Sequence, residues 1–162
     1  MLGRMKFCPQ CAADLRQSAD DENDRLSCTR EGCTYVFYNN PVPVVAAIIE
    51  YDEQVMLVHQ PDWPAKMLGL VSGFLEADET PEEAIIREIK EETNLDTRTP
   101  EFIGHYAFVQ QNQLILAYAA KCSGNIRLNE ELDRYKLIDP DRLVAWDFGT
   151  GFAVRDWLAQ RN

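Results

Sequence analysis

The chain has 162 residues, 46% of them hydrophobic, and its 16 lysines and arginines against 27 aspartates and glutamates give a formal net charge of −11. This length predicts one main domain with a small appendage. Duplex nucleic acid is normally bound by a basic surface, so the acidic balance argues against that class of partner. No apolar run approaches the length of a bilayer, which excludes a membrane-spanning helix.

Four cysteines near the start of the chain fall into two close pairs, Cys8 with Cys11 and Cys28 with Cys33, separated by about sixteen residues. This spacing is typical of a structural zinc site with four thiolate ligands. Two disulfides are the alternative. No signal peptide precedes the pairs and the total of 5 cysteines is odd, so we expect a reducing, cytoplasmic setting and bound Zn²⁺. We therefore predict a small zinc ribbon over residues 1–38.

A segment rich in proline and asparagine, residues 39–43, marks the start of the main domain, which we place at residues 39–162. Apolar runs in this domain predict strands, and the polar residues between them predict turns. Before the central helix we expect two strands joined by a tight turn, a loop and a third strand (44–51, 54–60, 61–66 and 67–71). After it we expect a hairpin, a short strand and a second helix (102–109 with 114–121, 135–138 and 148–160). This order indicates an α+β fold with a mixed sheet between helices.

The central helix is predicted by its capping residues and its apolar stripe. Thr80 suits the N-cap, Pro81 the first helical position, and Glu83 stands three residues after the cap, as in a capping box. Apolar residues from Ala84 onward recur at helical spacing, so one side of the helix is expected to pack on a core. Asn94 suits the left-handed position that ends a helix.

Three carboxylates, Glu88, Glu91 and Glu92, are three and four positions apart and therefore project from one face of this helix. Like charges at that spacing destabilise a bare helix by a few tenths of a kcal/mol per pair. A solvated acidic face is one interpretation, because exposed glutamates are common. The other is a site for a divalent cation and, through it, for phosphate chemistry. Arg87 can pair with Glu91 and hold it in place.

The wider pattern favours the second interpretation. It runs from a glycine through a glutamate to the charged helix (Gly73, Glu79, Arg87-Glu88-Ile89, Glu91-Glu92 and Leu95). This pattern resembles the Nudix box, the signature of hydrolases that act on nucleoside diphosphates linked to another group. Asn94 stands where the box has its last glycine, so one residue suited to a helix C-cap replaces another.

The resemblance implies an α/β/α sandwich and a catalytic Mg²⁺ or Mn²⁺. The implied ligands are the box carboxylates and the backbone carbonyl of the box glycine, with Arg87 beside them (Gly73, Glu88, Glu91 and Glu92). In such enzymes the general base is either Glu88 or a glutamate outside the box. Glu130 and Glu131 follow the box at a comparable distance, and we favour Glu131 as a further ligand or base. Glu79 is expected to brace the loop before the helix.

A zinc ribbon followed by this box resembles the subgroup of NADH pyrophosphatases and related dinucleotide diphosphatases. That resemblance implies a homodimer in which Phe74 and the partner subunit's Tyr38 stack on the adenine base, and we add Glu76 to the substrate-binding residues. The Ser-Gln-Pro-Trp-Pro-Phe-Pro signature of NADH pyrophosphatases is missing, because residues 105–111 read His-Tyr-Ala-Phe-Val-Gln-Gln. NADH as the preferred substrate is therefore left open.

We accordingly predict Mg²⁺-dependent cleavage of the pyrophosphate bond in a dinucleotide-like substrate such as NAD(H), ADP-ribose or FAD. A nucleoside triphosphate pyrophosphatase is an alternative, because it would share every box residue and differ only in its pocket. A nucleotide-binding regulator without turnover is a third hypothesis. Such a protein would be expected to lack box carboxylates, and none is missing here.

Overall fold

The computed structural model describes residues 5–17 and 25–161. The chain divides into two compact units, Met1–Pro41 and Val42–Asn162, which are described separately. Within the described ranges, no helix has both the length and the apolar character that crossing a membrane requires.

The first unit is a small antiparallel sheet with little apolar interior. Its strands β1 (Leu15–Gln17), β2 (Leu26–Cys28) and β3 (Val36–Phe37) pair in that order. The buried residues at its centre are Cys8, Leu15 and Leu26. So few buried side chains do not offset the conformational entropy of ordering such a segment, which calls for a further source of stability.

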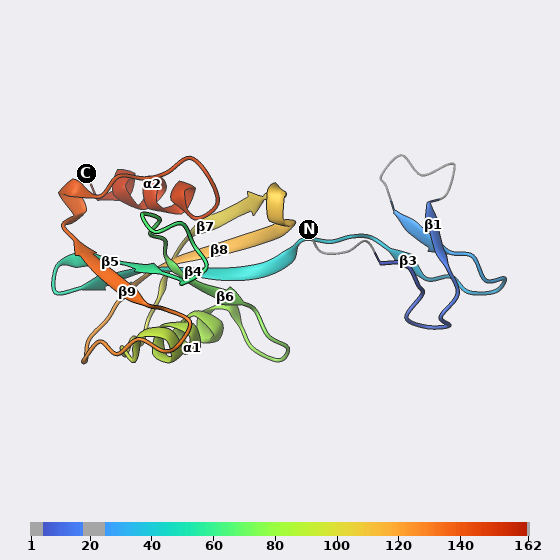
Figure 1. Ribbon diagram of the computed structural model, residues 1–162, viewed down its shortest axis with the longest axis horizontal. Coiled ribbons are helices and arrows are strands. Elements are labelled where there is room, and N and C mark those ends of the chain that lie inside the picture. The colour runs from blue at the N-terminus through green and yellow to red at the C-terminus, as the bar shows by residue number, and fades with distance from the viewer. Residues whose placement is uncertain (1–4, 18–24, 162) are drawn as a thin grey trace. The chain divides into compact units, whose positions relative to one another are not determined.

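The second unit is built on a mixed sheet (Figure 1), as the order of predicted elements indicated. Its strands are β4 (Val42–Tyr51), β5 (Gln54–His59), β6 (Val71–Phe74), β7 (Glu101–Phe108), β8 (Gln113–Lys121) and β9 (Arg134–Ile138). They lie in the order β7-β8-β4-β5-β9, with β6 also paired to β4. The β4–β8 pair is parallel and the other pairs are antiparallel. Two short 3₁₀ turns follow β7 and β9 (Val109–Gln111 and Pro140–Arg142).

The central strand β4 is buried on both faces because each face is covered by a helix. Alternate residues point to opposite sides of a strand. Val45 and Ile49 therefore pack in the core under α1 (Pro81–Thr93), whereas Ala46 and Ile48 pack in the core under α2 (Gly151–Gln160). Each Val or Ile buried in this way contributes about 1.5–3 kcal/mol. The α/β/α sandwich implied by the family resemblance is confirmed (Figure 1).

Most element boundaries agree with the predictions, and two differ. The turn between β4 and β5 is the predicted one, with positive φ at both Asp52 and Glu53. The sequence predicts the third strand at residues 67–71, but β6 begins only at Val71. Before it, Gly69 makes an isolated bridge to Val58. The second helix begins at residue 151 rather than 148. In both cases the apolar residues are present where expected, but they lie in irregular backbone.

Candidate active site and zinc site

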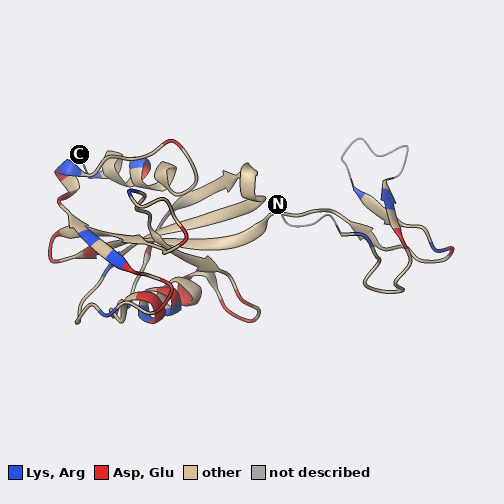
Figure 2. Ribbon diagram, in the orientation of Figure 1, with Lys and Arg blue, Asp and Glu red and all other residues tan. Residues whose placement is uncertain are grey.

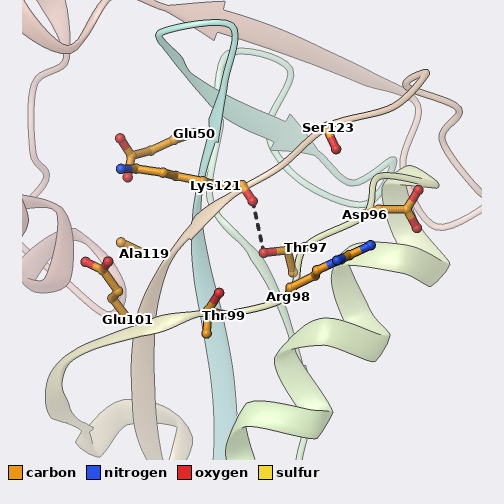
Figure 3. A pocket seen from close by; sticks show the side chains of 9 residues that line it. All are labelled: Glu50, Asp96, Thr97, Arg98, Thr99, Glu101, Ala119, Lys121 and Ser123. Carbon is orange, nitrogen blue, oxygen red and sulfur yellow. Dashed lines mark hydrogen bonds between the residues drawn. The ribbon is translucent and has the colours of Figure 1, made fainter.

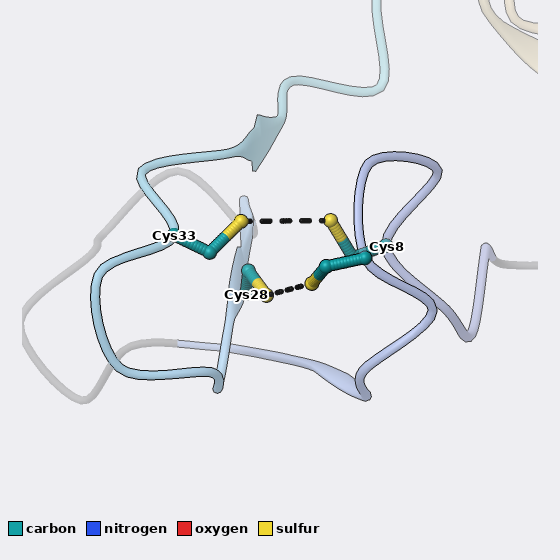
Figure 4. Close-up of side chains that lie close together, drawn as sticks. Cys8, Cys28 and Cys33 are labelled. Atoms are coloured by element: carbon teal, nitrogen blue, oxygen red, sulfur yellow. Dashed lines mark hydrogen bonds between the residues drawn. The ribbon is translucent and has the colours of Figure 1, made fainter.

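The four predicted zinc ligands converge in the first unit (Figure 4). The sulfurs of Cys8 and Cys33 are 3.8 Å apart, those of Cys11 and Cys28 are 3.4 Å apart, and all four lie within 4.8 Å of one another. All four cysteines are free, so the disulfide alternative does not hold in this structure. A tetrahedral site with Zn–S bonds of about 2.3 Å separates its sulfurs by roughly 3.8 Å. The observed spacing therefore fits a zinc ion.

Two tight turns bring these sulfurs together. Ala12, after the first pair, and Gly32, within the second, both have positive φ, and the backbone N–H of Ala12 donates to the carbonyl of Cys8.

The backbone N–H of Ala13 and the neighbouring thiols lower the pKa of Cys11 to about 7. The backbone N–H of Arg30 lowers the pKa of Cys28, but desolvation and the same thiols raise it overall to about 12. Four thiols so close together ionise fully only beside a cation.

The carboxylate-bearing helix α1 forms as its capping residues predicted. Thr80 is the N-cap and makes a reciprocal capping box with Glu83, and Asn94 ends the helix in the left-handed conformation. Glu88 faces back to strand β6, where its carboxylate occupies the space that a side chain at Gly73 would fill. Glycine at this position is therefore required by the close approach of Glu88.

Arg87 joins the carboxylates around it into one network. Its guanidinium donates to Glu79 at 2.8 and 3.1 Å, to Glu88 at 2.7 Å and to Glu91 at 3.2 Å. It also donates to the backbone carbonyl of Phe74. The bonds to Arg87 lower the pKa of Glu79, which stays ionised and braces the loop before the helix, as predicted from the resemblance.

Glu92 is the most constrained carboxylate of the cluster. It is only 2% exposed, and its Oε2 is the one buried side-chain oxygen or nitrogen without a hydrogen-bond partner among the described residues. Burial, followed by the charges of Glu88, Glu131 and Glu91, raises the pKa of Glu92 to about 8. Burial also raises the pKa of Glu88, against the effect of Arg87. An unpartnered buried carboxylate costs free energy unless something bonds to it.

The structure brings Glu131 to this cluster from a distant part of the sequence. Its charge raises the pKa of both Glu88 and Glu92. The backbone N–H of Asn129 donates to the carbonyl of Glu92 at 3.1 Å, and the side chain of Asn129 accepts from the backbone N–H of Glu131. Asn129 was not singled out from the sequence, although an asparagine two residues before a loop residue is a known turn signal.

The predicted substrate-binding residues differ in their surroundings. Phe74 ends β6 beside the cluster with 57% of its surface exposed, and the exposed Glu76 follows it in the loop. The backbone N–H of Glu76 donates to Glu79 at 2.7 Å. Tyr38 belongs to the first unit, where it is also 57% exposed and lies 5.1 Å below the guanidinium of Arg25. An exposed aromatic ring is available for stacking.

A separate hollow of about 620 Å³ lies away from these residues (Figure 3). It is lined by the ends of β4 and β8 and by the segment between α1 and β7. Lys121 points toward Glu50 at one end, and Arg98 points the other way, so their charges do not converge on one point (Figure 3). None of the predicted site residues lines this hollow, and we assign it no role.

The carboxylates of α1 fit a hard divalent cation in their chemistry and charge. Figure 2 shows that acidic residues are concentrated along this helix. Mg²⁺ and Mn²⁺ prefer carboxylate oxygens and take part of their shell from water and phosphate. The unpartnered Oε2 of Glu92 is the oxygen that such an ion would satisfy. Unlike the cysteine sulfurs, the ligand atoms of these glutamates do not all lie within 4.8 Å of one another.

The α/β/α sandwich, Gly73 on β6, the bracing Glu79 and the carboxylates of α1 are the arrangement that the resemblance to Nudix hydrolases implies. The family model of the NUDIX domain matches residues 40–157, and the chain belongs to that family. The recognition of the box in the sequence is thereby confirmed.

The chain is similar to proteins named as hydrolases and pyrophosphatases. An NAD-capped RNA hydrolase NudC from Vibrio atlanticus is 27% identical over 76% of this chain and 45% of its own length, so the chain spans about half of that relative. An ADP-ribose pyrophosphatase from Methanocaldococcus jannaschii is 28% identical over 79% of both chains. Among solved structures, a NUDIX hydrolase from Nitrosomonas europaea superposes with a TM-score of 0.76 at 25% identity, covering 97% of this chain and 92% of that one.

Proposed function

We propose that the chain hydrolyses the pyrophosphate bond of a nucleoside diphosphate linked to another group, with Mg²⁺ or Mn²⁺ as cofactor, and that its substrate is dinucleotide-like. Water would add across one P–O–P bond and release two monophosphates. The observation that carries this proposal is the buried Glu92 with its unpartnered oxygen, set beside Glu88, Glu91 and Glu131.

The side chains of α1 are prepared for this reaction before any ligand binds. Arg87 fixes the orientation of Glu88 and Glu91. Glu92 keeps its proton near neutral pH because its pKa is about 8, and it becomes a strong anionic ligand only when a cation replaces that proton. When bound, the metal ion would neutralise the pyrophosphate and lower the pKa of a coordinated water.

Two glutamates are candidates for the general base. Glu88 lies against Gly73, and burial raises the pKa of its carboxylate, which improves it as a proton acceptor. Glu131 approaches the same cluster from the opposite loop and is exposed, so a substrate can reach it. We propose Gly73, Glu88, Glu91, Glu92 and Glu131 as the set from which the ligands and the base are drawn.

The choice of a dinucleotide-like substrate is supported by two observations. Phe74 presents a free ring next to the carboxylates, and a stacked base gains about 1–3 kcal/mol on such a ring. The relatives named above act, by their names, on an NAD cap or on ADP-ribose. ADP-ribose, NAD(H) and FAD share an adenosine diphosphate half. In the proposed homodimer, the partner's Tyr38 would be a second stacking ring.

A substrate panel tests the proposal. The zinc-loaded protein is incubated with Mg²⁺ and ADP-ribose, NADH, FAD, an NAD-capped oligonucleotide or nucleoside triphosphates, and the products are separated. Release of AMP from a dinucleotide-like compound is the expected result. Release of pyrophosphate from triphosphates alone would favour the triphosphate alternative. Binding without any product would favour the regulator and overturn the proposal.

A further inference from the structure

Three polar or charged side chains are buried among the described residues: His59, Glu92 and Thr93. Thr93 bonds to the carbonyl of Ile89 within α1, and Glu92 belongs to the carboxylate cluster. His59, at the end of β5, is 3% exposed and has no part in the proposed reaction. A buried imidazole needs partners, and those of His59 lie in the loop just after β5 and in the distant segment before β9.

The ring of His59 is bonded at both nitrogens. Its Nδ1 lies 2.6 Å from Oδ1 of Asp133, and its Nε2 lies 3.3 Å from the backbone carbonyl of Pro64. The backbone N–H of Asp133 also donates to the carbonyl of His59 at 3.1 Å. Trp63 packs edge-on against the imidazole, and Arg134 donates to the carbonyl of Ala65, so the loop after β5 is attached to the start of β9.

Asp133 is the last residue of the segment that presents Glu131. The other end of this segment, Asn129, is fixed by its backbone bond to the carbonyl of Glu92, and Leu132 is buried in the core under α1. The segment therefore has one attachment on the carboxylate helix and one on His59. Between them, Glu131 is exposed, and its backbone N–H donates to the side chain of Asn129.

We propose that His59, acting through Asp133, is a positioning residue that holds the 129–133 segment so that Glu131 faces the carboxylates of α1. This inference rests on the proposed function, because it assigns Glu131 a part in the reaction. Partners that orient metal ligands typically contribute about 10- to 100-fold to activity or metal affinity. Loss of the His59–Asp133 bond is expected to lower kcat by about 10-fold and to change KM less.

The test variant is Asp133→Asn, which removes the carboxylate charge from the bond to His59 and leaves the buried histidine intact. Asp156→Asn is a closely matched control. Both aspartates are 40% exposed, both pair with the adjacent arginine, and Asp156 accepts a 2.9 Å bond from the half-buried Tyr106 on the opposite side of the sheet. His59→Ala serves as a second variant if it folds.

Three measurements decide the inference: kcat and KM for ADP-ribose with Mg²⁺, amide hydrogen exchange at residues 129–133, and the same kinetics in a Glu131→Gln background. We expect Asp133→Asn to lower kcat about 10-fold and to speed exchange at Glu131 and Leu132, whereas Asp156→Asn does neither. In the Glu131→Gln background, Asp133→Asn should lower kcat by less than about 2-fold, because both substitutions remove the same contribution to turnover.

The inference is overturned if Asp133→Asn and Asp156→Asn lower kcat equally, if the loss persists in full in the Glu131→Gln background, or if Glu131→Gln alone keeps full activity. Unchanged exchange at residues 129–133 in Asp133→Asn would also overturn it. If the unaltered protein released no AMP from any compound, the proposed function would fail instead, and the exchange rates alone would then decide whether His59 and Asp133 hold the segment.

Discussion

The two candidate metal sites of this chain are built in opposite ways. In the first unit, four sulfurs already lie within 4.8 Å of one another, held by two short turns and very little core. In the second unit, the helix packs on a large core, and of the carboxylates it carries Glu88 is bound by Arg87 while burial raises the pKa of Glu92 to about 8. We propose that the first site depends on a zinc ion for its fold, whereas the second has a fold of its own that brings like charges close together.

Because the two sites differ in this way, we expect removal of the metal to have a different effect at each. A structural zinc ion supplies the folding free energy of a unit that has few buried side chains. A catalytic ion at α1 would instead relieve the repulsion among carboxylates that the core forces together. Removal of zinc should therefore change structure, and removal of Mg²⁺ should change activity and the pH dependence of stability.

The largest expected effect is the loss of the zinc site. Structural zinc contributes about 10–16 kcal/mol of apparent binding free energy in small domains. We expect about one zinc per chain by elemental analysis, and close to none in Cys28→Ser, with loss of amide protection in β1, β2 and β3. Cys122→Ser is the control, because Cys122 lies in the second unit and should not alter the zinc content. Equal zinc in all three proteins, or none, would contradict the assignment.

The second effect is a fall in the stability of the metal-free second unit as pH rises. The folded form keeps the proton of Glu92 up to a pKa of about 8, while the unfolded chain releases it near 4.5, so stability falls between these values. At about 1.36 kcal/mol per pKa unit, the loss is on the order of 5 kcal/mol. Glu92→Gln should remove this contribution, so that only the part due to the raised pKa of Glu88 remains. All 3 tryptophans lie in the second unit, so their fluorescence reports its unfolding in EDTA.

The third effect is on turnover. Glu92→Gln should lower kcat for ADP-ribose by at least about 100-fold, since even the orienting partners of metal ligands contribute about 10- to 100-fold. Glu82→Gln places the same substitution in the first turn of the same helix, where Glu82 accepts a bond from Tyr118 outside the cluster. That variant should keep nearly full activity. Similar rates for the two variants would argue against a special role for Glu92.

The smallest effect concerns the substrate. Phe74→Ala should raise KM for ADP-ribose by about 5-fold or more, in keeping with a stacking contribution of about 1–3 kcal/mol. Because Phe74 is largely exposed, the free energy of unfolding should change by less than about 0.5 kcal/mol. Phe102→Ala, at a position 54% exposed on β7, is the matched control for KM. An unchanged KM in Phe74→Ala would remove the stacking role.

Local signals in the sequence were enough to predict the helix α1, because its caps Thr80 and Asn94 act within a few residues. The start of β6 could not be predicted in the same way. Residues 67–70 are as apolar as a strand, and only their tertiary position shows that they form irregular backbone before Val71. Periodicity measures apolar character and does not show which backbone pairs with which.

The site, like the fold, could be predicted only in part from the sequence. The box predicted which glutamates of α1 share one face, but their spacing could not show that Glu92 would be buried with an unpartnered oxygen. Nor could it show that His59 would meet Asp133, since 74 residues separate them and only the pairing of β5 with β9 brings them together. Such contacts depend on topology, which a single sequence does not encode locally.

The central claim is that the carboxylates of α1 form a divalent metal site, and Mn²⁺ binding followed by the electron paramagnetic resonance of the free ion tests it most directly. The zinc-loaded protein and its Glu92→Gln and Glu82→Gln variants are titrated without substrate. The account predicts that the unaltered protein and Glu82→Gln take up Mn²⁺ and that Glu92→Gln binds it at least about 10-fold more weakly. Equal uptake by all three proteins, or uptake by none, would contradict it.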